Sequence, residues 1–480
     1  MSDDLLFQTV SEQARQMRAG KLSSVELTRT YLDALKTRGM ALNAVVTLTE
    51  SLALQQAEQA DRERKAGRVR SPLHGIPYGV KDLFATRGIP TTWGLPVHRN
   101  PEFSSPEYPS GSEKKMLPVF DYDATVITRL REAGAVLVAK LAMIELAGGG
   151  GYEYAHASAT GPCRNPWNPS RWAGGSSSGS GAAVAAGTVS FALGTETWGS
   201  ITVPAAFCGI TGLRPTYGRV SRYGAMALSW TMDKIGPMAR SAEDCALVLQ
   251  VLAGADPNDL STVNQPPFRY RFSQWRHYPF RLGLLPTDFS HAPDAQKAFE
   301  DALQVFRKRG YRMQEVKLPD YPFNAAAEVI ITAEGASAFE NLIRSQQLYE
   351  LRDPAQVSGL LAGLALPAVD YLRAMRIRHA AIRAVAAIFE QVDVLIAPTL
   401  LQGALPIDKN FNETWVHMGG NGGFANLAGL PSVSVPMGFT ADRLPLGLEI
   451  IGAPYEEAKI LALAQLFQSE TDWHRHRPPV

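Results

Sequence analysis

The sequence has few cysteines, no metal-binding histidine motif and no long run of like charges. Its three cysteines form no CxxC pair, which argues against both a disulfide framework and a thiolate metal site. Its nine histidines include no HExxH motif, and we expect neither a metal nor a cofactor. Lys plus Arg (47) balance Asp plus Glu (46). The sequence therefore predicts no surface for binding nucleic acid.

The sequence also lacks long apolar runs. No stretch of about 18 uninterrupted apolar residues is present to span a membrane. The N-terminal MSDDLLFQTV is acidic where a secretory signal is basic. We therefore expect a cytoplasmic protein with no membrane partner. Apolar residues make up 45% of the 480, enough to fill a sizeable core.

The order of the predicted elements is typical of an α/β fold. Ser23 and Glu26 form a capping box that predicts the start of an amphipathic helix. Turn residues precede a short apolar rise that ends in Lys81, which predicts a lysine at the end of a strand. Further along, residues 189–193 favour a buried strand and residues 194–199 a turn.

No internal repeat or linker divides the chain, so we expect one large domain over residues 1–480. Its predicted architecture is a twisted, mixed β-sheet with helices on both faces. Residues 99–118 are polar and rich in proline and predict a surface loop. Residues 325–390 have an almost wholly helical pattern, and we expect them to cover the substrate.

Residues 173–187 read AGGSSSGSGAAVAAG and permit several interpretations. A flexible linker fits poorly beside the apolar helix predicted at residues 182–186. A phosphate-binding loop is disfavoured because Ala182 stands where the lysine is needed. A nucleophile elbow centred on Ser177 requires a preceding strand, which the sequence does not predict, and a downstream histidine. His417 is available, but nothing around it marks it for that role.

Three segments together point to another interpretation. They are LHGIPYGVKD around Lys81, GGSSSGSG around Ser176, and GSITVPAAFCGITGLRPTYG around Ser200. The combination, with 24 residues between the two serines, resembles the amidase signature family of serine hydrolases. The resemblance extends from about residue 20 to 470, with its core over about 70–240.

The resemblance implies a Ser-Ser-Lys triad. Ser200 matches the nucleophile, Ser176 the proton relay, and Lys81 the base, which must be neutral to accept a proton. Burial lowers the pKa of a lysine, whereas a carboxylate such as Asp82 opposes that change. The family also implies a cis peptide bond between Gly175 and Ser176. The other serines of the loop are then left with structural roles.

The residues before Ser200 imply an oxyanion hole and also depart from the family pattern. The backbone N–H groups of Thr197, Trp198 and Gly199 are expected to face the developing oxyanion. Trp198 replaces a usual glycine, and it either shapes the acyl side of the pocket or points into the core. Glu196 stands in place of Asp, and Thr202 in place of Arg, which removes a cation from near the site.

These departures favour a stand-alone hydrolase that acts on a small-molecule amide, aryl amide, carbamate or ester. The alternative is the glutamine-hydrolysing subunit of a tRNA-dependent amidotransferase, and a third hypothesis is a non-catalytic scaffold of the same family. Gly150, Tyr152 and Tyr154 lie in a segment that the family places near the substrate channel. They either contact the substrate or pack as ordinary core residues. Monomer and homodimer both stay open.

Overall fold

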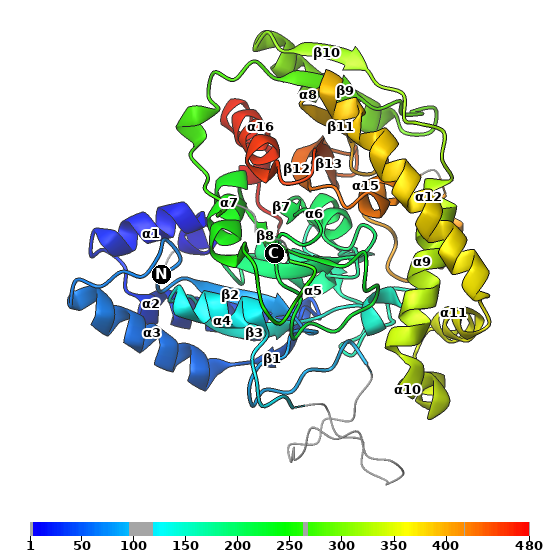
Figure 1. The fold of residues 1–480 in the computed structure, drawn as a ribbon. Helices are drawn as coiled ribbons and strands as arrows, with labels where there is room; N and C mark the ends of the chain where they lie inside the picture. The colour runs from blue at the N-terminus through cyan, green and yellow to red at the C-terminus, as the bar shows by residue number, and fades with distance from the viewer. Residues whose placement is uncertain (1–2, 96–118, 263–266, 417, 480) are drawn as a thin grey trace.

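The computed structural model describes residues 3–95, 119–262, 267–416 and 418–479, so the predicted loop at 99–118 lies outside it. Its centre is an eleven-stranded sheet in the order β1-β3-β2-β6-β8-β7-β12-β13-β11-β9-β10, beside a two-stranded sheet of β4 and β5 (Figure 1). The strands are β1 (Val45–Leu48), β2 (Pro77–Lys81), β3 (Val136–Leu141), β4 (Arg164–Asn165), β5 (Asn168–Trp172), β6 (Phe191–Glu196), β7 (Thr211–Arg214), β8 (Lys234–Ala239), β9 (Arg281–Leu284), β10 (Arg312–Glu315), β11 (Val394–Pro398), β12 (Ser432–Phe439) and β13 (Pro445–Gly452).

The large sheet is mixed, as predicted. Strands β3, β2 and β6 run parallel to one another, and so do β11, β9 and β10. The strands between these two groups pair antiparallel. Because β2 and β6 are parallel neighbours, their carboxyl ends meet at one edge of the sheet, which is where α/β proteins place their sites.

Helices cover both faces of the sheet (Figure 1). They are α1 (Val10–Arg18), α2 (Ser24–Ala34), α3 (Glu50–Lys65), α4 (Thr125–Glu132), α5 (Ser178–Ala185), α6 (Thr202–Cys208), α7 (Ala242–Leu252), α8 (Pro293–Lys308), α9 (Phe323–Ala338), α10 (Glu340–Arg344), α11 (Pro354–Leu364), α12 (Ala368–Ala386), α13 (Ile388–Gln391), α14 (Phe411–Thr414), α15 (Gly422–Leu427) and α16 (Glu457–Glu470). The helical pattern predicted for residues 325–390 is thus confirmed. Short 3-10 or π turns join several of these helices.

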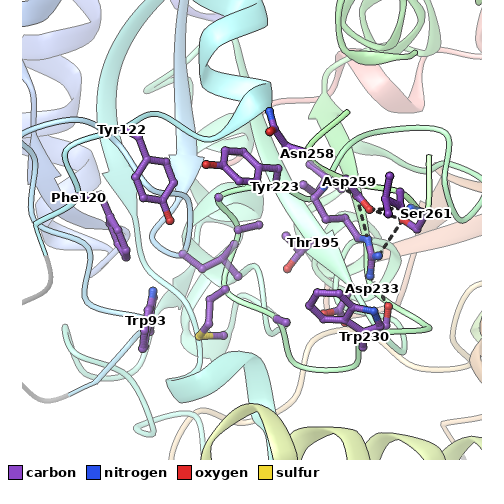
Figure 2. A pocket seen from close by; sticks show the side chains of 18 residues that line it. Trp93, Phe120, Tyr122, Thr195, Tyr223, Trp230, Asp233, Asn258, Asp259 and Ser261 are labelled. Atoms are coloured by element: carbon purple, nitrogen blue, oxygen red, sulfur yellow. Dashed lines mark hydrogen bonds and ion pairs between the residues drawn. The ribbon is translucent and has the colours of Figure 1, made fainter. Parts of the chain in front are cut away.

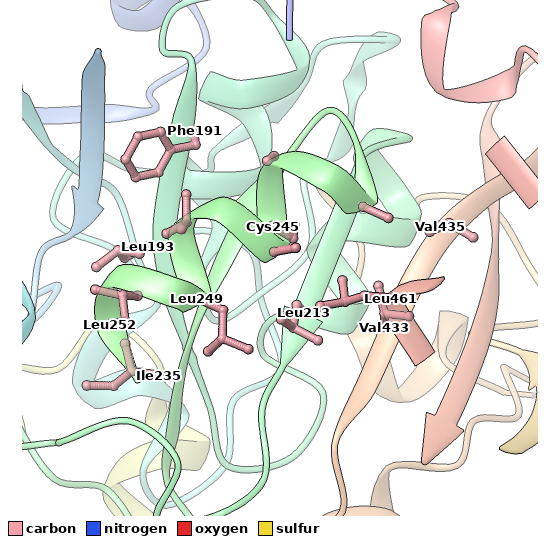
Figure 3. Packing of buried hydrophobic residues seen from close by; sticks show 14 of the residues in the cluster. Phe191, Leu193, Leu213, Ile235, Cys245, Leu249, Leu252, Val433, Val435 and Leu461 are labelled. Atoms are coloured by element: carbon pink, nitrogen blue, oxygen red, sulfur yellow. The ribbon is translucent and has the colours of Figure 1, made fainter. Parts of the chain in front are cut away.

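The main core lies between the sheet and the helices that pack on it. Figure 3 shows Leu249 and Leu252 of α7 facing Leu193 of β6 and Ile235 of β8, all of them buried. Burying an apolar side chain of this size contributes about 1.5–3 kcal/mol. This packing holds β6 and β8 in place, and the loops at their ends carry the candidate site. Cys245 of α7 lies in the same core, and Cys163 and Cys208 are likewise buried free thiols.

The local predictions succeed where the signal lies within one element. Ser23 caps α2 and forms the predicted capping box with Glu26. Lys81 ends β2. The turn predicted at residues 194–199 is wrong in part, because β6 continues to Glu196. Gly194 belongs to that strand, where a Cβ atom would lie 2.9 Å from Met238 Sδ. Close packing, and not a turn, explains this glycine.

Two further features differ from expectation or bear on it. The stretch before the serine-rich loop was expected not to be a strand, but Asn168–Trp172 pairs with β4 in the small sheet. Within the described residues, no single helix is long and apolar enough to cross a membrane. The bent pair formed by residues 354–364 and 368–391 meets that test together, by length and composition only.

Candidate active site

The structure brings the three predicted residues together at the carboxyl edge of β2 and β6. Lys81 Nζ lies 2.7 Å from Ser176 Oγ, which donates a hydrogen bond to Ser200 Oγ at 2.9 Å. Lys81 Nζ also donates to Thr195 Oγ1 at 2.9 Å. A continuous chain of hydrogen bonds therefore joins Ser200 to Lys81. Thr195, on β6, was not singled out from the sequence, because only the pairing of β6 beside β2 places its hydroxyl near the lysine.

Lys81 is fully buried, and its charge is disfavoured. Burial lowers its pKa from 10.5 to about 7, although the carboxylates of Asp233 and Glu196 favour the ammonium form. The expected opposition from Asp82 is not among these causes. Its carboxylate is held 3.1 Å from the buried ammonium of Lys140 and accepts hydrogen bonds from Thr92. Asp82 thus belongs to a separate buried ion pair.

The serine-rich loop is tightly packed, so the linker interpretation is wrong. A Cβ atom on Gly175 would lie 2.6 Å from the Trp172 ring, and one on Gly179 would lie 2.4 Å from the backbone nitrogen of Ala142. The Gly175–Ser176 peptide bond is cis, which confirms the predicted isomer. The carbonyl of Ser176 accepts a hydrogen bond from the Ile144 N–H. These contacts leave the loop little room to move.

The remaining serines of the loop bind backbone carbonyls. Ser177 Oγ donates to the carbonyl of Thr195, Ser178 Oγ to that of Ala142, and Ser180 Oγ to that of Leu193. All three side chains are buried. Ser177, the nucleophile in the elbow interpretation, is thus engaged in holding α5 against β6. His417 lies outside the described residues.

The turn that carries Ser200 has the geometry of an oxyanion site. Gly199 adopts a φ of 84°, which favours glycine. No described residue accepts a hydrogen bond from the backbone N–H groups of Trp198 or Gly199. Ser200 is 9% exposed, so it is reachable but largely desolvated. Free N–H groups beside a nucleophile can stabilise a developing oxyanion.

Glu196 fixes the residues on the other side of Ser200. One carboxylate oxygen accepts hydrogen bonds from the N–H groups of Ile201 and Thr202, at 2.8 and 3.0 Å. The other accepts from Arg214 at 2.6 Å and from Asn426 at 3.0 Å. Burial opposes ionisation of Glu196, but Arg214 outweighs it and its pKa is lowered to about 2. Arg214 and Asn426 come from distant segments and carry no sequence signal of their own.

The profile of the Amidase family matches residues 26–461. The chain belongs to the amidase signature family. A glutamyl-tRNA(Gln) amidotransferase subunit from Geobacter sp. (strain M21) is 36% identical to this amidase, over 98% of this chain and 99% of the relative.

Solved structures give the same family. Native peptide amidase from Stenotrophomonas maltophilia has a TM-score of 0.82 and 32% identity, with 98% of both chains covered. A chain of the vestigial protein complex that reveals the evolutionary origins of an s-triazine catabolic enzyme has a TM-score of 0.85 and 31% identity. That comparison covers 98% of this chain and 100% of the other. The likeness extends over the whole fold.

Trp198 of this amidase points neither into the core nor fully into solvent. Its side chain lies against α15, where a Cβ atom on Gly422 would be 2.4 Å from the indole and one on Gly423 would be 3.3 Å away. The residue is 37% exposed. The two glycines leave space for the ring beside the nucleophile turn, so Trp198 lies at the edge of the site.

The glycine-rich segment 148–154 of the amidase docks on the helical segment. Gln356 of α11 donates to the carbonyls of Glu145 and Gly149. A Cβ atom on Gly150 would lie 2.3 Å from the carbonyl oxygen of Gln356. The buried Asp353 accepts hydrogen bonds from the N–H groups of Glu153 and Tyr154. These contacts attach α11 to the site loop; that the helices cover the substrate stays a prediction.

The two tyrosines of this segment have packing partners. The Tyr152 ring lies edge-on to Trp172 and Phe411, with ring centroids 6.0 Å apart in both cases. The Tyr154 ring stacks on His156, and its hydroxyl accepts a hydrogen bond from an asparagine. Packing thus accounts for both residues, and their contact with substrate stays a prediction. In the described part of the amidase, no group of three or more His, Cys, Asp or Glu gathers to hold a metal.

Proposed function

We propose that this amidase hydrolyses carboxamides through an acyl-enzyme on Ser200. The observation that carries the proposal is the chain of hydrogen bonds from Ser200 through Ser176 to the buried Lys81. A lysine whose pKa is about 7 is partly neutral near neutral pH, so its amine can accept a proton. Because Lys81 already donates to Thr195, its lone pair is available to Ser176.

In the proposed reaction, the Ser200 hydroxyl attacks the carbonyl carbon while its proton passes through Ser176 to Lys81. The backbone N–H groups of the turn stabilise the oxyanion, at roughly 3–4 kcal/mol for each donor. Collapse of the tetrahedral intermediate breaks the carbon–nitrogen bond, and the proton returns through Ser176 to the leaving nitrogen. Water then hydrolyses the ester of Ser200 by the reverse relay.

For the substrate, the first candidate is an uncharged amide, aryl amide, carbamate or ester processed without a partner protein. Thr202 stands where the family often has an arginine, and its N–H donates to Glu196. The nearby cation, Arg214, is buried and held by Glu196. A substrate that needs a basic group beside the nucleophile is therefore disfavoured.

The second candidate is glutamine, hydrolysed by one component of a tRNA-dependent amidotransferase. The curated relatives favour this candidate over the first, because amidotransferase subunits with 36–39% identity match nearly the full length of this chain. Their name includes a tRNA and describes them as subunits, so the prediction that no nucleic acid is involved has no support from them. A homodimer stays untested.

A hydrolysis screen over primary amides, aryl amides, carbamates, esters and glutamine separates the candidates. We expect turnover of an uncharged amide by the isolated chain, and loss of turnover in Ser200→Ala. A fluorophosphonate probe should label the wild type and leave Ser200→Ala unlabelled. Ammonia release from glutamine that requires an added partner would favour the amidotransferase. Neither labelling nor turnover would favour the scaffold hypothesis.

A further inference from the structure

A cavity of about 630 Å³ lies at the lysine end of the relay (Figure 2). Its wall is largely aromatic, and we call it the aromatic chamber, after Trp93, Tyr122, Met226, Tyr223 and Trp230 that line it. Figure 2 shows these rings around an open centre, with Thr195 facing the same space. A cavity of this size accommodates a bicyclic aromatic group.

Two contacts connect the chamber to the catalytic residues. Thr195, part of its wall, accepts the hydrogen bond from Lys81 Nζ. Asp233, also in the wall, accepts a hydrogen bond of 2.5 Å from the hydroxyl of Thr197, the first residue of the nucleophile turn. The chamber therefore borders both the base and the residues expected to hold the oxyanion.

The charged groups of the chamber wall are paired within the protein. Asp233 also accepts hydrogen bonds from the N–H groups of Leu228 and Ser229. Arg222 lies 3.5 Å from Asp259 and stacks over the Trp230 ring. With these charges neutralised, the chamber offers aromatic faces and a hydroxyl, which suit an uncharged aromatic group.

We propose that the aromatic chamber holds the leaving-group half of the substrate, and that this half is a neutral aromatic amine. The inference rests on the proposed amidase function. The proton that restores the leaving nitrogen travels from Lys81 through Ser176, so the leaving group lies on the lysine side of Ser200. The chamber occupies that side.

The balanced step begins with an N-aryl carboxamide. The Ser200 Oγ–carbon bond forms, the carbon–nitrogen bond breaks, and the proton lost by Ser200 reaches the nitrogen to give a neutral arylamine. The arylamine is retained by the rings of the chamber until it dissociates. Water then converts the acyl-enzyme to the carboxylic acid and free Ser200.

Matched substrates with one acyl group test the proposal. We expect N-(2-naphthyl)acetamide to be hydrolysed with a higher kcat/KM than acetamide. In Tyr223→Ala, the ratio of the two kcat/KM values should fall by about tenfold, because one stacking face is lost. Ala227→Trp, which places an indole in the chamber, should lower the ratio further. Tyr349→Ala removes an exposed aromatic residue outside the chamber and should leave the ratio unchanged.

A binding measurement separates failure of the chamber from failure of the proposed function. Calorimetry with 2-naphthylamine and the Ser200→Ala enzyme should show binding that Ala227→Trp abolishes, whether or not any amide is turned over. An enzyme that hydrolyses amides but keeps the same substrate ratio in both chamber variants would overturn the inference and leave the function standing. Absence of 2-naphthylamine binding would also overturn it.

Discussion

Replacing Lys81 with methionine tests whether the lysine is neutral in the folded protein, without knowledge of the substrate. Burial lowers the pKa of Lys81 from 10.5 to about 7 in the folded state, whereas the unfolded chain keeps the ordinary value. Between these two values, the unfolded state binds more protons than the folded state at this site. The free energy of unfolding of the wild type therefore rises with pH relative to Lys81→Met.

The magnitude follows from the two pKa values. Between pH 7 and pH 9, the wild type should gain roughly 2 kcal/mol of unfolding free energy over Lys81→Met. Below the folded pKa the lysine is protonated in both states, so the difference changes little there. The lost hydrogen bonds to Ser176 and Thr195 affect the variant at every pH and do not alter the trend.

Urea unfolding of both proteins at several pH values measures this difference, and the other titrating groups largely cancel. A difference that does not change from pH 7 to pH 9 would show that Lys81 is charged in the folded state, and the proposed relay would then lack its base. The kinetic counterpart is a rise in kcat/KM through about pH 7. A flat profile from pH 6 to pH 9 would contradict the same argument.

Three further predictions concern the residues around the relay. Ser176→Ala should reduce kcat/KM on an amide more than on an activated ester of the same acid, because only the amine needs a returned proton; equal losses would exclude the relay role. Lys140→Met should lower the urea unfolding free energy by about 3–5 kcal/mol, because it leaves Asp82 buried and unpaired, and Asp82→Asn in the same background should recover part of the loss. Gly150→Ala should destabilise the protein by more than about 1 kcal/mol, since its φ of 84° and the carbonyl of Gln356 exclude a Cβ atom. Hydrogen exchange in α11 should rise in this last variant, and unchanged exchange would show that the loop does not hold the helix.

Local signals predicted much of the fold. The capping box at Ser23, the strand that ends at Lys81 and the long helical segment after residue 325 depend on neighbouring residues, and the structure has all three. The end of β6 was misplaced because Gly194 resembles a turn residue in isolation. Only the approach of Met238 from the next strand shows that the glycine serves packing.

Three motifs along the chain were enough to identify the family, and with it the candidate residues Lys81, Ser176 and Ser200. The environment of those residues depends on the folded structure, because electrostatics and packing depend on neighbours in space. Folding pairs Asp82 with Lys140, away from the candidate base, and places Asp233 and Thr195 beside that base instead. It also joins Glu196 to Arg214 behind the nucleophile, and gathers distant aromatic residues into one chamber. No spacing along the chain reveals such contacts, since strand pairing and loop packing create them.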